Sequence, residues 1–397
     1  RGENMYGRYI NHGSIQILAT GTPVSNEGSG FRQEGWDWNH FPGTTATVLP
    51  LKELRAKIKN LDQFSGFEEM LLSDEAFAGG ISLDNKQGAF AMKLHEHDKY
   101  NGSLRARKSV FFFDNRAVAL GSDIQSALPL PTQTTLFQTY IDQINKSYYL
   151  NGKNITEFPY KETVKKEKTI ISDGQNNYFF VKNGEVQFSK SVQQSFDEET
   201  DAPTSNDFAL ASINHCGDLK NGRYEYLILI QPSEKELKLY LKAKEPSYIV
   251  HQSDSTAHIV FDKQTKTSGY VFFAPSTTAN LLVKKVNTPC LIMTDESIAN
   301  KLTIAVSDPD LRFYDGKPDD NYDNNGKRLE RSVYSRSWKD NPSKTSEINV
   351  TLNGIWKTEK NYDFIKTETI NDTTVLTVNC DSNRQDNSIK LKKTDSN

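Results

Sequence analysis

The sequence predicts an all-β protein built from antiparallel sheets, and three observations predict it. Apolar and polar residues alternate with a period of two in short stretches along the chain, which is the pattern of half-buried strands. Helical periodicity is confined to two short segments. Asn-Gly pairs, which favour tight hairpin turns, separate many of the stretches, at Asn101, Asn151, Asn183, Asn221 and Asn353. Short strands joined by turns indicate a sandwich architecture.

The expected strands can be followed in chain order. Examples are Ser14–Ala19, Gly88–Leu94, Tyr224–Gln231, His258–Asp262, Gly269–Ala274, Leu302–Val306 and Glu347–Leu352. In the second of these, Phe90, Met92 and Leu94 share one face, and the two alanines and the lysine between them share the other. This separation is typical of a half-buried strand.

Two segments favour helix. Leu49–Asn60 carries leucine and isoleucine at helical spacing. Ser233–Lys244 opens with a Ser-x-x-Glu capping box formed by Ser233 and Glu236 and continues with an apolar stripe. Neither segment is long enough to build a helical domain.

Length and composition bound the organisation. A chain of 397 residues exceeds what one core usually holds, and we expect a large β-domain over residues 1–283 and a small one over residues 284–397. The net charge of -3 argues against a broad basic surface for nucleic acid. No apolar stretch approaches the roughly 20 residues that span a bilayer. The three cysteines predict neither a disulfide framework nor a zinc site.

The chain opens with Arg1-Gly2-Glu3-Asn4, without an initiator methionine or an apolar leader. We therefore expect the natural polypeptide to begin upstream, with a signal peptide absent from this fragment.

Several motifs then appear in a fixed order. They are GRY-x-x-HG at Gly7–Gly13, QEGWDWN at Gln33–Asn39, LPLKEL at Leu49–Leu54, TTLFQ at Thr134–Gln138 and KKVN at Lys284–Asn287. The ordered set resembles the β-sheet half of polysaccharide lyase family 8, which contains chondroitin AC, hyaluronate, xanthan and chondroitin ABC lyases. The likeness is greatest to the chondroitin sulfate ABC lyases.

The resemblance implies a galactose-mutarotase-like β-supersandwich followed by a small C-terminal antiparallel β-domain. It also implies a secreted or periplasmic bacterial enzyme that cleaves chondroitin and dermatan sulfate by β-elimination at uronic acids. In such a reaction the uronate carboxylate is neutralised, a Tyr or His removes the C5 proton, and a Tyr protonates the leaving oxygen. In the family these groups belong to an upstream α/α toroid, so no catalytic residue is assigned here, and the chain by itself is expected to be inactive.

Candidate substrate contacts lie near the start of the chain. A guanidinium suits sulfate and carboxylate groups, so Arg8 is a candidate, although a surface arginine is the alternative. His12, in a turn before an expected strand, either faces the cleft or shapes the turn.

The segment from Trp36 to His40 holds further candidates. Strand alternation would place Trp36, Trp38 and His40 on one face, where aromatic rings could stack on a sugar and Asn39 and His40 could hydrogen bond to it. The alternative is a strand whose tryptophans anchor the core. ABC-type relatives commonly carry arginine where His40 stands, which puts a sulfate contact there in doubt.

Cation sites and basic surfaces are weaker signals. No cofactor is required by the sequence, although a divalent cation such as calcium is possible at Glu34 and Asp37. The run Asp319-x-Asn321-x-Asp323, with Glu330, echoes a calcium loop but has its glycine at Gly326, two positions late. Arg105, Arg107 and Lys108 either line an anionic polysaccharide path or protect a strand edge.

The expected partners are a glycosaminoglycan and the α/α toroid domain of the same enzyme, whose cleft this part would wall. Neither nucleic acid nor a membrane span is expected. Two alternatives stay open: a non-catalytic carbohydrate-binding β-sandwich module, and part of a hyaluronate or chondroitin AC-type lyase.

Overall fold

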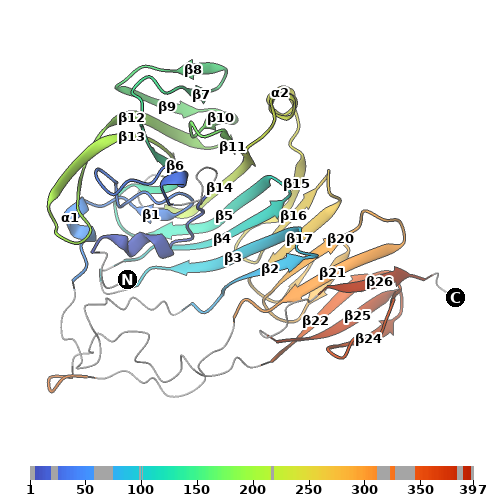
Figure 1. Cartoon of the computed structure of the whole chain (residues 1–397). Coiled ribbons are helices and arrows are strands. Elements are labelled where there is room, and N and C mark those ends of the chain that lie inside the picture. Colours follow the sequence, from blue (N-terminus) through green and yellow to red (C-terminus); the bar gives the residue numbers. More distant parts are fainter. Residues whose placement is uncertain are drawn as a thin grey trace.

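The computed structural model describes residues 5–18, 26–57, 75–97, 100, 102–215, 219–310, 322–326, 345–381 and 388–394. Over these residues, 26 strands form four sheets, accompanied by two short α-helices and two 3-10 turns (Figure 1). All described strand pairs are antiparallel, beginning with β1 and β6. The predicted all-β class is confirmed.

The first two sheets use the N-terminal part of the chain. The five-stranded sheet has the order β1 (Thr45–Thr47), β6 (Thr132–Tyr140), β13 (Pro203–Asn214), β12 (Glu185–Phe196) and β9 (Tyr160–Lys165). The nine-stranded sheet has the order β2 (Ala78–Leu83), β3 (Gln87–His95), β4 (Arg105–Phe113), β5 (Arg116–Ser126), β14 (Leu219–Ile230), β11 (Asn177–Lys182), β10 (Lys168–Ser172), β7 (Tyr148–Leu150) and β8 (Lys153–Ile155).

The other two sheets use the C-terminal part. The seven-stranded sheet has the order β15 (Tyr248–Ser253), β16 (Ala257–Asp262), β17 (Thr267–Phe272), β20 (Cys290–Asp295), β21 (Lys301–Ser307), β26 (Ile389–Lys393) and β23 (Trp356–Thr358). The second five-stranded sheet has the order β18 (Ser276–Thr277), β19 (Val283–Val286), β22 (Ser346–Asn353), β25 (Thr373–Cys380) and β24 (Ile365–Ile370).

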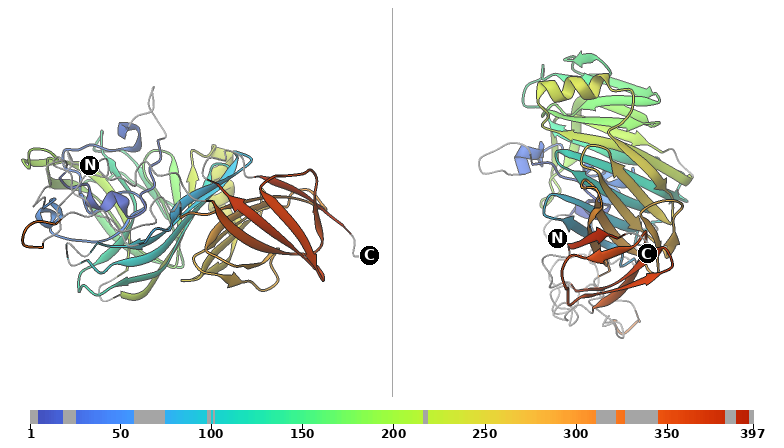
Figure 2. Two further views of the ribbon diagram at one scale, coloured as in Figure 1. Left: turned by 90° about the horizontal axis from the view of Figure 1, so that it is seen from below. Right: turned by 90° about the vertical axis from the view of Figure 1, so that its right-hand side faces the viewer.

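Three apolar cores lie between successive sheets, so the sheets stack in the order in which they are given above. The nine-stranded sheet shares one core with the first five-stranded sheet and a second core with the seven-stranded sheet. A third core joins the seven-stranded sheet to the last sheet. Figure 2 shows this succession, from the green and blue strands at one end to the orange and red strands at the other.

Polar side chains cross the second of these interfaces. The guanidinium of Arg116 on β5 contacts the carboxylate of Asp262 on β16 at 2.5 and 3.2 Å. The imidazole of His258 on β16 lies between the hydroxyls of Ser109 and Ser122, at 2.7 and 2.8 Å. All five side chains are buried, and these contacts give each of them a partner within the protein.

Strand β3 alternates as predicted, but its two faces differ from a simple half-buried strand. Ala89 and Ala91 are buried because they face the second core; on the other face Leu94 is buried in the first core, while Phe90 is 42% exposed. Small side chains on the covered face let the two sheets approach closely. The larger residues lie on the face toward the first core, whose cover grows along the strand from Phe90 to Leu94.

The segment before the first sheet corrects one expectation. Residues 14–18 form no strand, although inward and outward residues alternate there and Ile15 and Ile17 pack on the first core. The backbone of Ile15 donates one hydrogen bond to Pro42, and no described strand runs beside the segment to complete a ladder. The alternation of apolar and polar residues therefore predicted correctly which side chains point inward, but it did not predict whether the segment pairs with a strand.

Of the two predicted helices, the first is shorter within the described residues than the sequence predicts, and the second agrees closely with its prediction. Helix α1 covers only Leu51–Leu54, and the predicted continuation beyond residue 57 lies outside the described residues. Helix α2 covers Glu234–Lys242, and the Ser233 side chain accepts a hydrogen bond from the Glu236 amide, which confirms the predicted cap.

One predicted turn is wrong. Asn221-Gly222 lies inside β14, where the pairing with β5 shifts register. A Cβ at Gly222 would lie 2.8 Å from a Leu219 methyl group, so the glycine permits a bulge rather than a hairpin. By contrast, Asn151-Gly152 joins β7 to β8 with both residues at positive φ, as predicted.

The predicted division at 283/284 falls at the start of β19 and stays a prediction. No helix among the described residues is long and apolar enough to cross a membrane.

Candidate functional site

The best candidate site is a cavity of about 160 Å³ beside the first turn of the chain. The 3-10 turn η1 (Gly7–Asn11) supplies one wall and the end of β3 supplies another. Both Arg8 and His12 line this cavity, together with Glu96 and Tyr100. The structure thus places two of the predicted contact residues beside one cavity, Arg8 within the turn and His12 directly after it.

Arg8 is the distinctive group in this cavity. Its guanidinium lies 4.1 Å from the ring centroid of Tyr100 and 5.0 Å from that of Tyr9. Nη2 donates to the Tyr9 hydroxyl at 3.4 Å. Nε and Nη1 are buried and find no hydrogen-bond partner among the described residues. Buried donors without partners are costly, so this arginine is prepared to receive an acceptor, and an anion suits it best.

Glu96 is an acidic residue of the same cavity whose carboxyl group interacts electrostatically with the Arg8 guanidinium. Burial raises the pKa of the Glu96 carboxyl, and the positive charge of Arg8 opposes that rise. Its carboxylate accepts from the Leu104 amide at 3.4 Å. No ion pair within 4.0 Å joins Glu96 to Arg8 among the described residues, so the two Arg8 nitrogens are left for a ligand.

His12 is buried in the same wall. Its Nδ1 lies 3.0 Å from the carbonyl oxygen of Thr45, and its ring centroid lies 4.7 Å from that of Tyr9. Burial lowers the pKa of His12 to about 3, so the ring is neutral near pH 7. A neutral imidazole held in this way can donate or accept a hydrogen bond but brings no positive charge.

Lys108 fixes the turns that carry these residues. Its amine donates to the carbonyl oxygens of His12 at 2.5 Å and Gly43 at 2.7 Å. Gly13 and Gly43 both have φ near +80°, a conformation that glycine adopts without strain. Burial lowers the pKa of Lys108 to about 7. This lysine is a structural clamp beneath the candidate site.

The segment from Trp36 to His40 corrects a second expectation, because it consists of turns and not of a strand. Trp36 and Trp38 pack in an aromatic cluster, and the Trp38 indole donates to the Phe196 carbonyl at 3.0 Å. Trp38 is 0% exposed. Such burial agrees with the alternative that the tryptophans anchor the core. A substrate contact by Trp38 remains a prediction, and it would require the aromatic cluster to open.

Asn39 and His40 are also buried and already hydrogen bonded. The Asn39 amide donates to Asp37 and to the Leu49 carbonyl, and its oxygen accepts from the Leu49 amide. The His40 Nδ1 lies 3.0 Å from the Thr135 hydroxyl. Burial lowers the pKa of His40, and Asp37 opposes that effect. Their substrate contacts remain predictions as well.

Gln138 links two of the sequence motifs. Its side chain accepts from the Asp37 amide at 3.0 Å and donates to the carbonyl oxygens of Asp37 and His40 at 3.2 and 2.8 Å. The TTLFQ motif therefore holds the QEGWDWN motif in place. Hydrogen bonds of this kind between distant motifs explain why both are needed for one local structure.

Sequence reasoning missed Glu96 and Tyr100 and misjudged Lys108. Lys108 shares its strand face with the buried residues Ala106 and Val110, and a lysine in an apolar alternation was the available signal. Arg107 points to the opposite face, where it lies 3.8 Å from Glu75. The three basic residues therefore do not line one path.

No metal centre is visible in the described part of the chain, where no group of three or more His, Cys, Asp or Glu residues could hold an ion. Glu34 and Asp37 form no such group. The possible calcium loop at Asp319, Asn321 and Glu330 lies outside the described residues.

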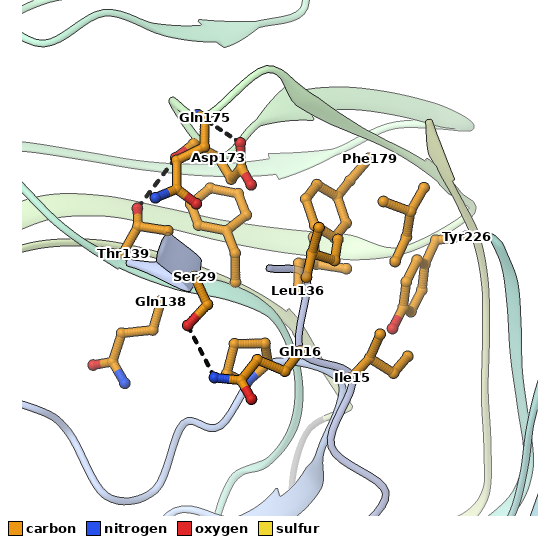
Figure 3. Close-up of a pocket in the computed structure, with 14 residues that line it drawn as sticks. Ile15, Gln16, Ser29, Leu136, Gln138, Thr139, Asp173, Gln175, Phe179 and Tyr226 are labelled. Atoms are coloured by element: carbon orange, nitrogen blue, oxygen red, sulfur yellow. Dashed lines mark hydrogen bonds between the residues drawn. The ribbon is translucent and has the colours of Figure 1, made fainter. Parts of the chain in front are cut away.

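A second cavity, between the first two sheets, is too small for a sugar. It encloses about 20 Å³, the space of a single water, and is lined by apolar groups such as Leu136, Phe179 and Tyr226 (Figure 3). Its polar rim is internally paired, with Gln16 donating to Ser29 at 3.0 Å.

Comparisons with known proteins match nearly the whole chain. A family model described as "Polysaccharide lyase family 8, super-sandwich domain" matches residues 1–241, and one described as "Polysaccharide lyase family 8, C-terminal beta-sandwich domain" matches residues 250–311.

Named relatives agree with these models. A chondroitin sulfate ABC exolyase of Bacteroides thetaiotaomicron is 42% identical over 90% of this chain and 34% of its own length. A chondroitin sulfate ABC endolyase of Proteus vulgaris is 30% identical over 94% of this chain and 34% of its own length. The chain therefore spans about a third of the length of these relatives. A Paenibacillus xanthan lyase structure, 20% identical, covers 91% of this chain and 31% of its own, with a TM-score of 0.66, which shows a shared fold.

Proposed function

Because the chain belongs to polysaccharide lyase family 8, we propose that it is the β-sheet part of an enzyme that degrades glycosaminoglycans by β-elimination at uronic acids. The substrate class we propose is chondroitin and dermatan sulfate. The 42% identity to a chondroitin sulfate ABC exolyase supports this choice. A hyaluronate or AC-type lyase is the alternative within the family.

We propose that the remainder of the enzyme is an α/α toroid that carries the catalytic groups. The chain spans 34% of the ABC-type relatives, and both matched family models describe β-domains. In this proposal the chain supports the toroid and lines one side of the substrate cleft. Phe90 and Phe112, 42% and 38% exposed on adjacent strands, are candidates for the apolar contact between the two parts.

The observation that carries the proposal is that two of the three guanidinium nitrogens of Arg8 lack an acceptor within the described part of the chain. Its Nε and Nη1 are buried without acceptors among the described residues. Tyr9 and Tyr100 hold the group in place by their rings. A uronate carboxylate or a sugar sulfate would supply two oxygens in the plane of the guanidinium, which is the geometry that this side chain recognises best.

Such a contact would contribute orientation and not proton transfer. The C5 proton of a uronate becomes easier to remove when the neighbouring carboxylate is held by hydrogen-bond donors. His12 is neutral near pH 7 because burial lowers its pKa to about 3, so it is a weak candidate for the base. We propose that the base and the acid come from outside this chain, and that Arg8 and His12 position the polysaccharide.

Two further parts of the proposal concern organisation and place. We propose a large domain over residues 1–283 and a small one over residues 284–397. We also propose that the enzyme acts in the periplasm or outside the cell, because its polymeric substrate is found there.

The test uses the complete enzyme that contains this chain. An Arg8→Met variant should lower kcat/KM on chondroitin sulfate by about 10- to 100-fold, since a hydrogen bond to a charged group contributes about 1.5–3 kcal/mol. Formation of unsaturated uronate is followed by its absorbance. The matched control is Arg32→Met, which removes an exposed arginine stacked on Tyr140 at 5.4 Å.

Equal activity of the two variants would contradict the role of Arg8. Absence of any unsaturated product from the complete protein, combined with retained polysaccharide binding, would favour the non-catalytic binding module instead.

A further inference from the structure

A larger cavity lies on the other side of the nine-stranded sheet. It encloses about 620 Å³, within the range of about 300–1,000 Å³ that is usual for small-molecule sites. Strands β10, β11 and β14 supply one wall, and the segment after α2 together with β15 supplies the other. In Figure 1 this is the region where α2 leads into the gold strands. It lies at the junction of the nine-stranded and seven-stranded sheets.

The floor of this cavity is apolar and aromatic. Phe180 and Tyr240 form a tilted pair with ring centroids 6.0 Å apart. Leu227 is buried beneath the cavity, and Ile249 on the rim is 40% exposed. Aromatic and aliphatic surface of this kind can cover the apolar face of a sugar ring. Phe180 and Leu227 are only 8% and 3% exposed, and the Lys168 amine lies 5.6 Å from the Phe180 ring centroid, so the accessible part of this surface comes mainly from Tyr240 and Ile249.

Ammonium groups surround this floor. Lys168 donates to the Ala243 carbonyl at 3.1 Å, and Lys263 donates to the Pro246 carbonyl at 2.9 Å. These acceptors are neutral. Among the described residues no carboxylate forms an ion pair with either lysine, so the positive charge of each is uncompensated. Lys244 adds a third charge on an exposed rim position.

The acidic residues of the lining compensate only part of this charge. Glu225 is already engaged, because it pairs with Lys182 at 3.3 Å and accepts from the Tyr248 hydroxyl at 3.0 Å. Glu167 and Glu245 also border the cavity. The lining contains four lysines and three glutamates. The Lys182–Glu225 pair cancels, which leaves three lysines against two glutamates, and this excess of one positive charge favours an anionic ligand.

We propose that this cavity binds an acidic sugar unit of a glycosaminoglycan chain, as a second site separate from the one at Arg8. This inference rests on the proposed function for the identity of the polymer. The two sites lie on different strands of the same sheet: β3 and β11 are four strand spacings apart, or about 19 Å at roughly 4.8 Å per spacing.

A second site would retain the polymer near the first. Once one acidic unit is held, the remainder of the chain meets the enzyme at an effective concentration far above its bulk concentration. The consequence is stronger binding of long chains than of short ones, without any change in the contacts at the reacting sugar.

The experiment measures binding and not activity, and it uses the 397-residue chain. The ligand is a size-defined chondroitin sulfate oligosaccharide, titrated by calorimetry at low salt. The variant is Lys168→Gln with Lys244→Gln. We expect its affinity at this site to fall by about three- to tenfold, the effect of losing two partly exposed ionic contacts.

The matched control is Lys165→Gln with Lys166→Gln, which removes the same charge from exposed positions outside the cavity. Equal affinity of the test and control variants would overturn the proposal. So would equal binding of a desulfated, carboxyl-reduced oligosaccharide, because that ligand lacks the anionic groups.

Arg8→Met separates this inference from the proposed function. Binding that survives in Arg8→Met and is weakened by the Lys168 and Lys244 changes supports the second site, whether or not the complete enzyme forms unsaturated product. Loss of all binding in Arg8→Met would show that the oligosaccharide binds only at the first site, and would overturn the second.

Discussion

The amine of Lys108 on β4 reaches the backbone carbonyl oxygen of His12, at 2.5 Å, from a position where it is buried on all sides. The same amine also binds the carbonyl of Gly43. This one side chain thus fastens two turns to the nine-stranded sheet, the turn that contains Gly13 and the turn that contains Gly43. The first of these turns directly follows the segment that carries Arg8, so the position of the candidate site depends on this contact.

Replacement of Lys108 by methionine should therefore destabilise the fold. The buried carbonyl oxygen of Gly43 would lose the donor that Lys108 provides, and that of His12 would keep only the Thr45 amide at 3.4 Å. We expect the free energy of unfolding to fall by about 2–4 kcal/mol. Urea unfolding of the 397-residue chain measures it. Lys93→Met is the control, because Lys93 lies over the Phe77 ring and holds no turn. Similar losses in both variants would contradict the clamp.

The pair of Arg116 and Asp262 gives a second prediction. Both side chains are buried between two sheets, so Arg116→Met leaves a buried carboxylate without its partner. We expect a loss of about 3–5 kcal/mol in the free energy of unfolding. The double variant Arg116→Met with Asp262→Leu should recover most of that loss, since it removes both charges. A single variant that costs less than about 1 kcal/mol would refute this account.

Acid should destabilise the protein through its buried histidines. Burial lowers the pKa of His258 to about 3, while an unfolded histidine has a pKa of about 6.5. Between these values the unfolded chain binds the extra proton, so this contribution to stability is complete above pH 6.5 and falls as the pH drops toward 3, by about 1.4 kcal/mol per pH unit.

The measurement compares pH profiles of unfolding. His258→Asn should flatten the decline between pH 6.5 and pH 3 relative to the unaltered chain. His251→Asn, at an exposed position on β15, should leave the profile unchanged. If the His258 variant keeps the full slope, the acid sensitivity arises elsewhere.

The isolated chain should form no unsaturated uronate from chondroitin sulfate, because the proposal places the base and the acid in the toroid. The check is absorbance of the unsaturated product with purified 397-residue chain, using the complete enzyme as the positive control. Product formation by the chain alone would mean that residues of this chain supply the chemistry, and Glu96 beside Arg8 would be the first to test.

Local patterns in the sequence predicted the strands well where a strand also found a partner. Period-two alternation located β3, β14, β16, β17, β21 and β22. The same alternation at Ser14–Ala19 reported burial correctly and pairing wrongly. The cap at Ser233 was predictable because it involves only residues three apart.

The candidate site was predicted only in part. A motif drew attention to Arg8 and His12, but no local pattern could show that the Arg8 nitrogens are buried without acceptors, because that depends on Tyr100 and on the end of β3. The Trp36–His40 segment was expected to be a strand. Its backbone instead follows the hydrogen bonds of Gln138, about a hundred residues away in the chain.

The sequence by itself determined the all-β class, the six strands named above, one helix cap and the family, since these depend on spacing between near neighbours and on ordered motifs. Only the tertiary structure decided which face of each strand is covered, that Lys108 is buried and that two Arg8 nitrogens lack acceptors among the residues described. The physical reason is that burial and hydrogen-bond satisfaction are set by the residues that long-range sheet stacking brings together.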